Sequence, residues 1–287
     1  MKIYKKTILL MLCTVLSANI YAQKNYYRAA ENKFIAHEYY TAVDLYKAAY
    51  KKASKKMKPE CLFKIAECYR LINDPKYAEV YYQKALKAKC SQSGIALLYL
   101  AEMLKMQEKY PEAKAEYEKY SREVTSDKRG VDGAKSCEMS QKWKDNPTRH
   151  KVENMIQING KDWDYAPMYA ERKKYTTLLF SSTRQGATGD VDGNVGQLFA
   201  DIFVTKVDKN GKWSTPTPLS VPINTKENEA ACVLDIQGRN MYFTRCGVKK
   251  HYHPKCQIYS TVKRGQMWDE PSLMPFNVAL ISVGRCP

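Results

Sequence analysis

The sequence of 287 residues lacks the short motifs that carry most enzyme chemistry. It contains no G-x-S-x-G nucleophile elbow, no phosphate-binding P-loop, no H-E-x-x-H zinc motif and no Rossmann glycine pattern. His37 falls in a predicted helix hairpin, where a surface or packing role is preferred, and His150 falls in a predicted linker without a visible partner. We therefore expect a protein that is not an enzyme, with no catalytic residue, no cofactor and no metal site.

Long apolar runs and concentrated basic segments are also scarce. Beyond the N-terminus, no segment approaches the roughly 20 apolar residues that a membrane-spanning helix needs. The formal net charge is +17, but it is spread along the chain, without an arginine-rich block interleaved with aromatic residues. We therefore expect no nucleic-acid partner. A solubilising surface is the preferred interpretation, and attraction to an acidic envelope surface or partner is the alternative.

One short apolar run is present at the N-terminus. Residues 8–16 are mostly apolar, follow three lysines and precede the small residue Ala22. This pattern predicts a secretory signal peptide over residues 1–22. Cys13 raises the alternative of a lipoprotein, although Leu12 stands where a small residue is needed. We expect an exported protein of the periplasm that associates with the outer membrane only peripherally.

Export changes what the cysteines predict. Eight of the 9 cysteines lie beyond residue 22, at positions 61, 68, 90, 137, 232, 246, 256 and 286. In an oxidising compartment, cysteines form disulfides more often than catalytic or metal-binding thiol sites.

Residues 24–145 contain little glycine or proline and repeat at a fixed interval. Small residues come in pairs 12 residues apart: Ala30 and Ala42, Ala66 and Ala78, Ala101 and Ala113. Successive pairs are offset by 36 and 35 residues, which resembles tetratricopeptide repeats, in which helix hairpins recur about every 34 residues. Small residues on both helices of a hairpin allow close packing. We therefore predict a helical solenoid over residues 23–145, ending in a capping helix.

The solenoid has two interpretations. It would either bind a peptide or protein in a groove, or serve as a spacer or scaffold. Cys61 begins one predicted helix, and Cys90 follows the antiparallel helix beside it. Because those helix ends should meet, we regard Cys61 and Cys90 as a candidate disulfide.

A second repeat begins after the helix-breaking residues 144–147. Residues 178–184 (LLFSSTR) recur as 240–245 (NMYFTR), 201–204 (DIFV) as 257–260 (QIYS), and 213–216 (WSTP) as 268–271 (WDEP). Short strands with turn signals and a recurring aromatic motif predict β-propeller blades over residues 146–277. The predicted fold is therefore α + β in two domains: a helical solenoid followed by an incomplete propeller of about two blades.

A closed propeller typically needs 4–8 blades. Residues 278–287 diverge from the repeat where a further strand would follow. We therefore expect a truncated or frameshifted chain, with 278–287 as a divergent tail.

Two loops of this half raise the question of metal binding. Asp190, Asp192 and Asn194 have the spacing of a calcium loop that Asp201 could close. However, Val195 occupies the sixth position, where the sharp turn of such a loop needs glycine. A polar loop between strands is the preferred interpretation.

The second loop contains Cys246, His251, His253 and Cys256. These are chemically suitable zinc ligands, but structural zinc sites more often draw ligand pairs from separate turns. The flanking segments are predicted antiparallel strands, whose ends meet at a distance that suits a disulfide. A Cys246–Cys256 disulfide is preferred over free thiols and over a metal site.

The segments DYAPMY, LLFSSTR, NGKWSTPTPLSVPINTKENEAA and NMYFTRC resemble the WD40-like (PD40) propeller repeats of Bacteroidetes envelope proteins. With the preceding signal and helical repeats, the order resembles the PorE-like family of periplasmic components of the type IX secretion system. That family also tends to carry cysteines near residues 246–256.

The resemblance implies a non-enzymatic scaffold whose partners are other envelope or secretion-system proteins. It also implies contact with peptidoglycan, made only through an OmpA-like C-terminal domain that is missing from this sequence. Two alternatives remain: an envelope adaptor of another transport or surface-assembly system, and the accessory region of a peptidase or glycan-processing enzyme.

Overall fold

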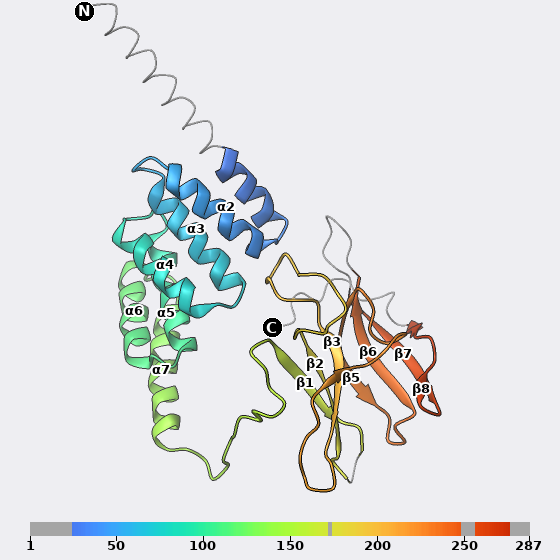
Figure 1. The fold of residues 1–287 in the computed structure, drawn as a ribbon. Helices are drawn as coiled ribbons and strands as arrows, with labels where there is room; N and C mark the ends of the chain where they lie inside the picture. The colour runs from blue at the N-terminus through green and yellow to red at the C-terminus, as the bar shows by residue number, and fades with distance from the viewer. Residues whose placement is uncertain (1–24, 172–173, 248–255, 276–287) are drawn as a thin grey trace, which may run out of the picture. The chain divides into compact units, whose positions relative to one another are not determined.

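The computed structural model describes residues 25–171, 174–247 and 256–275 (Figure 1). The chain divides into two compact units, which we call the helical unit and the β unit. The first comprises Met1–Lys151 with Gly193–Gly196, and the second comprises Val152–Asp192 with Gln197–Pro287. The predicted signal peptide, Cys13, and the tail at 278–287 lie outside the described residues. Within the described ranges, no helix is long and apolar enough to cross a membrane.

Seven helices lie in the described part of the helical unit. A helix over residues 25–35 is followed by α2 (Tyr39–Lys52), α3 (Lys58–Leu71), α4 (Pro75–Lys87), α5 (Ser93–Met106), α6 (Tyr110–Glu123) and α7 (Arg129–Asp145). Consecutive helices lie side by side, and the chain passes along the stack from blue to green in Figure 1. The predicted helical-repeat solenoid is confirmed from residue 25 onward, and α7 takes the place of the capping helix.

The turn inside each hairpin uses the same backbone conformation. His37, Asn73 and Glu108 have φ angles of 61°, 65° and 59°, and they are spaced by 36 and 35 residues like the alanines. Asparagine tolerates this left-handed region well, whereas glutamate seldom adopts it. The repeat therefore extends to the backbone conformation of the turns, although three different residue types occupy the position.

Buried small and aromatic residues hold the hairpins together. The six repeat alanines are fully buried, as are Tyr46 and Tyr82. One apolar cluster joins α3 to α7, and a second joins the helix at 25–35 to α2 and α3. An alanine at the crossing of two helices lets the backbones approach, and the tyrosines fill the space between hairpins.

The β unit contains two antiparallel sheets. The first has the strand order β1 (Asp164–Tyr169), β2 (Thr177–Ser182), β3 (Asp201–Lys206) and β4 (Thr217–Pro218). The second has β5 (Asn228–Leu234), β6 (Asn240–Cys246), β7 (Cys256–Arg264) and β8 (Met267–Trp268), and β9 (Ser272–Leu273) also pairs with β7. The predicted short antiparallel strands are present. The propeller itself remains a prediction.

The two sheets are copies of one another in register. Phe180 lies opposite Phe203 in the first sheet, and Phe243 lies opposite Tyr259 in the second, each pair stacked at 6.1 Å. The first strand of each sheet also contains a bulge. Ala166 and Ala231 occupy these bulges with φ angles of 50° and 52°.

An apolar core joins the two sheets. It contains Leu179 and Ile202 of the first sheet and Met241 and Phe243 of the second. Polar contacts add to it: the side chain of Asn224 accepts a hydrogen bond from the backbone of Ile202 and donates one back, both at 3.0 Å. The start of the second repeat is thus fixed onto the first sheet.

The structure corrects the candidate pairing of Cys61 with Cys90, because both are free thiols. The helix ends do meet as expected, since Glu60 accepts hydrogen bonds from the backbone and hydroxyl of Ser91, both at 2.9 Å. The two sulfurs face different surroundings: Cys90 packs into the α3–α7 cluster, whereas Cys61 lies near Tyr27. Burial raises the pKa of the Cys61 thiol to about 11.

Candidate functional site

Charged and aromatic side chains cover the face formed by the first helix of each hairpin. These helices are the one over residues 25–35, α3 and α5. Their side chains contact one another across the boundaries between hairpins. We call this surface the first-helix face and define it by six half-buried residues: Glu31, Lys64, Glu67, Arg70, Tyr99 and Glu102.

Three glutamates mark the repeat on this face. Glu31, Glu67 and Glu102 each follow a buried repeat alanine directly in the sequence, so they are again offset by 36 and 35 residues. A residue next to a core alanine lies at the edge of the packed surface, which explains why all three are half-buried. The face therefore carries one carboxyl group in each hairpin.

Glu31 is held by two neighbours. It accepts a hydrogen bond of 2.7 Å from the Tyr46 hydroxyl and forms an ion pair of 2.9 Å with Lys64 of the next hairpin. Burial alone would raise the pKa of Glu31, but the hydrogen bonds from Tyr46 and Lys64 lower it. The Lys64 ammonium also lies 4.7 Å from the centre of the Phe34 ring. The first two hairpins are thereby joined at the face.

Glu67 repeats this arrangement in the second hairpin. It accepts a hydrogen bond from the Tyr82 hydroxyl and pairs with Arg70 at 2.8 Å. The guanidinium of Arg70 lies 4.0 Å from the centre of the Tyr99 ring on α5. Such cation–π contacts over tyrosine are favourable, particularly when partly desolvated. The second and third hairpins are thereby joined at the face, as Lys64 and Glu31 join the first and second.

Glu102 breaks the pattern in the third hairpin. Among the described residues it makes no hydrogen bond and no ion pair. Burial raises the pKa of Glu102, more strongly than the charges of Arg70 and Arg129 lower it.

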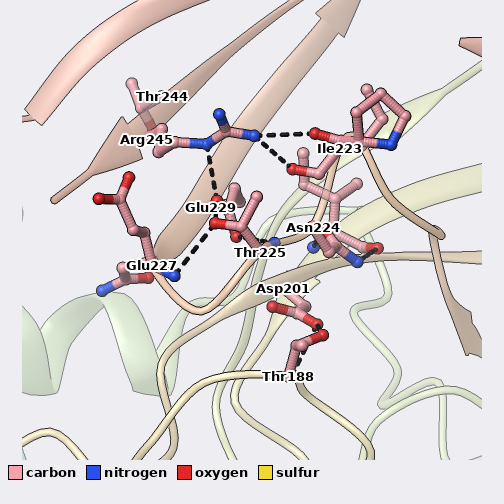
Figure 2. Close-up of polar contacts among 12 residues, drawn as sticks. Thr188, Asp201, Ile223, Asn224, Thr225, Glu227, Glu229, Thr244 and Arg245 are labelled. Carbon is pink, nitrogen blue, oxygen red and sulfur yellow. Dashed lines mark hydrogen bonds and ion pairs between the residues drawn. The ribbon is translucent and has the colours of Figure 1, made fainter. Parts of the chain in front are cut away.

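The β unit uses charged residues differently, as Figure 2 shows. Arg245 pairs with Glu229 at 2.7 Å and donates to the backbone oxygens of Pro222 and Ile223 at 3.0 and 2.9 Å. Its guanidinium also lies 5.0 Å from the centre of the Tyr259 ring. Glu229 is fully buried.

Glu229 accepts two further hydrogen bonds from Thr225, at 3.0 Å from its backbone and 2.6 Å from its hydroxyl. Burial raises the pKa of Glu229, against the opposing effects of Thr225 and Arg245. We call this arrangement of arginine, carboxylate, backbone oxygen and aromatic ring an arginine clamp.

The first sheet contains the same clamp. Arg184 pairs with Asp164, donates to the backbone oxygen of Ile158 at 2.8 Å, and lies 5.0 Å from the centre of the Phe180 ring. Burial alone would raise the pKa of Asp164, but hydrogen bonds from Arg184 and the Gly160 backbone lower it. Arg245 lies on β6 and Arg184 lies two residues past β2, so each clamp ties the segment before a sheet to the end of that sheet's second strand. We therefore assign both clamps to folding rather than to chemistry.

Asp201 is a further buried acid, drawn in Figure 2 with the Arg245–Glu229 clamp. Its Oδ2 accepts hydrogen bonds from the backbone and hydroxyl of Thr188 at 2.9 and 2.7 Å (Figure 2). Its Oδ1 has no hydrogen-bond partner among the described residues, and burial raises its pKa. In the part of the chain that the structure describes, no three His, Cys, Asp or Glu side chains are placed to hold a metal ion.

Cys246 and Cys256 lie opposite each other on β6 and β7, and their sulfurs are bonded at 2.05 Å. Sulfurs joined in this way present no thiolate to a metal ion. His251 and His253 lie outside the described residues.

Sequence reasoning missed both the glutamates of the face and the arginine clamps. The signal for the glutamates was present, because they share the offsets of the alanines. For the clamps, the arginines end the recurring segments 178–184 and 240–245. Their acidic partners follow a second recurrence, in which Ile158-Asn159 returns as Ile223-Asn224.

No protein-family model and no curated protein matches the sequence. Several solved helical-repeat structures are similar to part of this chain. The C-terminal tetratricopeptide-repeat domain of a putative FK506-binding protein from Plasmodium falciparum has 17% identity and a TM-score of 0.41, over 46% of this chain and 95% of that one.

Two further structures are similar over comparable lengths. The first tetratricopeptide-repeat domain of Spaghetti, solved with an HSP90 peptide, has 16% identity and a TM-score of 0.38, over 42% of this chain and 94% of that one. The Sgt2 domain from Aspergillus fumigatus has 17% identity and a TM-score of 0.38, over 48% of this chain and 91% of that one.

Proposed function

We propose that this chain is a non-enzymatic scaffold whose helical unit binds a protein partner on the first-helix face. The observation that carries the proposal is the row of half-buried charged and aromatic side chains that spans three successive hairpins. Here one carboxyl group recurs in every hairpin at the same place.

The face is also held in a fixed arrangement before any partner arrives. The exposed fractions of the Glu31, Lys64, Glu67 and Arg70 side chains are 27%, 24%, 12% and 20%, so each group is fixed by neighbours yet still reaches solvent. Binding normally costs free energy to order flexible side chains at an interface. Because these side chains are already ordered, that cost is smaller here.

The partners we propose are envelope or secretion-system proteins. Three observations support this: the signal-peptide pattern, the resemblance to the PorE-like family of the type IX secretion system, and the order of the two units. Two consecutive antiparallel sheets with matching register support the proposal that the β unit is built of propeller blades and offers a second interaction surface. Contact with peptidoglycan would be made by an OmpA-like domain in longer relatives.

Affinity capture from envelope extracts tests the proposal. The bait is the full chain, either wild type or carrying Lys64→Gln and Arg70→Gln on the face. Lys119→Gln with Arg122→Gln is the matched control, because it removes the same charge from exposed positions of α6. We expect the first variant to lose the captured proteins and the control to retain them.

The proposal fails if no envelope protein is enriched by the wild type. It also fails if both variants capture the same proteins as the wild type.

A further inference from the structure

Glu102 differs from its two counterparts on the first-helix face. Glu31 and Glu67 each accept a hydrogen bond from a tyrosine hydroxyl and each pair with a basic side chain. Glu102 occupies the same repeat position and is similarly half-buried, but among the described residues it has neither contact. A half-buried carboxylate without a partner is unfavourable, because it has lost water and gained no donor.

The third hairpin still has a tyrosine at the equivalent place. Tyr117 follows Tyr82 by 35 residues, and it lies close enough to Glu102 that burial and the glutamate charge together raise the pKa of its phenol. No hydrogen bond forms between them. The ring of Tyr117 instead packs against Gly133 of α7, where a Cβ atom would come within 2.4 Å of the ring. Tyr117 therefore contacts α7, whereas Tyr46 and Tyr82 each donate a hydrogen bond to the glutamate of their hairpin.

Three basic side chains, Arg70, Arg129 and Lys105, act on Glu102, and each is engaged by another group. Arg70 of α3 pairs with Glu67, and Arg129 of α7 pairs with Asp127 at 2.6 Å.

On α5 itself, Lys105 donates a hydrogen bond of 2.5 Å to the Ser136 hydroxyl of α7. Glu67 also acts on Glu102, and its negative charge disfavours the charged form of Glu102 further. Glu31 pairs with Lys64 and Glu67 pairs with Arg70, but among the described residues no basic side chain pairs with Glu102.

We infer that Glu102 receives a cationic side chain, an arginine or lysine, from the protein that binds the first-helix face. This inference rests on the proposed function and adds the chemistry of the partner. A charge-assisted hydrogen bond from a guanidinium or ammonium group would complete in the third hairpin the pairing that the first two make internally. The partner segment would then carry a basic residue where it passes α5.

The experiment titrates the full chain with Nα-acetyl-arginine amide and follows backbone amide signals by nuclear magnetic resonance. Nα-acetyl-citrulline amide is the matched neutral ligand, because it has nearly the same shape and no charge. We expect the arginine compound to shift the signals of residues 98–105, and the citrulline compound to shift them at least tenfold less. Glu102→Gln should abolish the shifts, whereas Glu123→Gln, which removes a carboxyl from an exposed position of α6 outside the face, should preserve them.

Three results would overturn the inference: no shift with the arginine compound at tens of millimolar, equal shifts with citrulline, or unchanged shifts in Glu102→Gln. A folding defect in Glu102→Gln would be visible as shifts across the whole helical unit before any ligand is added. In that case Glu102→Asp, which keeps the charge on a shorter side chain, should restore binding of the arginine compound, and failure to do so also overturns the inference.

The capture experiment separates this inference from the proposed function. Retention of the partner in Glu102→Gln, together with its loss in the Lys64→Gln and Arg70→Gln variant, would leave the face as a binding surface but remove the role of Glu102. If the wild type captures nothing while the arginine compound still binds at Glu102, the cation site stands and the proposed function fails.

Discussion

The helical unit and the β unit differ in how deeply their paired charged side chains are buried. On the first-helix face, the Lys64–Glu31 pair joins neighbouring hairpins and its side chains are 24% and 27% exposed, while the Arg70–Glu67 pair lies within α3 at 20% and 12%. In the β unit, the clamp pair Arg245 and Glu229 is 11% and 0% exposed, and it joins segments of a single sheet repeat. Breaking a buried ion pair strongly destabilises the fold, and a binding partner cannot contact it. Breaking a half-buried pair destabilises the fold little, and a partner can contact its exposed atoms.

The cysteines follow the same division. The helical unit has four free thiols in the described residues, at positions 61, 68, 90 and 137, and all are buried. The β unit has one free buried thiol in the described residues, Cys232, and in addition a covalent bond between adjacent strands. The β unit is thus held by strong specific contacts, and the helical unit by packing of small and aromatic residues. Specific polar groups of the helical unit remain available for recognition.

The largest effect on stability should come from breaking the arginine clamp of the second sheet, formed by Arg245 and Glu229. Glu229→Ala leaves Arg245 buried without its carboxylate, so we expect a loss of about 3–5 kcal/mol in the free energy of unfolding of the β unit. Urea unfolding followed by tryptophan fluorescence measures it. Glu270→Ala, at an exposed position, is the control and should change stability by less than about 0.5 kcal/mol. Equal losses in the two variants would mean that the clamp does not stabilise the sheet.

The disulfide should have the next largest effect. Cys246 and Cys256 are separated by 10 residues. In the chain-entropy model, removing a cross-link of this size costs about 2–3 kcal/mol. A variant with both cysteines changed to serine should therefore unfold at lower urea concentration and be insensitive to reductant. Wild-type protein should shift to the variant's midpoint when reductant is added. Reductant-insensitive wild-type protein would contradict the bond.

The smallest effect should come from the first-helix face. Lys64→Ala removes the ion pair with Glu31 and the contact with Phe34, but Glu31 keeps the hydroxyl of Tyr46. We expect a loss of no more than about 1 kcal/mol, since partly exposed pairs contribute little. Thermal unfolding followed by circular dichroism at the helix band measures it. A loss as large as that in Glu229→Ala would show that the face is part of the structural core.

The solenoid could be predicted from the sequence because the residues that recur are the ones that pack between the helices. Alanine at fixed offsets reports directly on helix contact, and these alanines are buried. The sequence also placed the ends of α3 and α4 together correctly. It could not give the directions of the Cys61 and Cys90 side chains, which depend on the helix rotation that the surrounding core imposes.

The charged sites were harder to predict because pairing depends on residues far apart in the chain. Arg245 and Glu229 are 16 residues apart, and Arg184 and Asp164 are 20 apart, so neither pair stands out within a segment. Glu102 lacks a partner because of contacts made by α7: Lys105 donates to Ser136, and the Tyr117 ring packs against Gly133. The offset of the three glutamates could have been read from the sequence, but the missing partner of the third could not.

Photo-cross-linking tests the central claim, that the first-helix face binds a protein, most directly. Tyr99 on the face and Tyr77 on α4 are each replaced in the full chain by p-benzoyl-phenylalanine, which preserves an aromatic ring at both positions. Cells are irradiated, and adducts are identified by mass spectrometry. The account predicts a discrete adduct with another envelope protein from position 99 and a much weaker one from position 77, although Tyr77 is the more exposed of the two. An adduct from position 77 alone, or none from position 99, would contradict it.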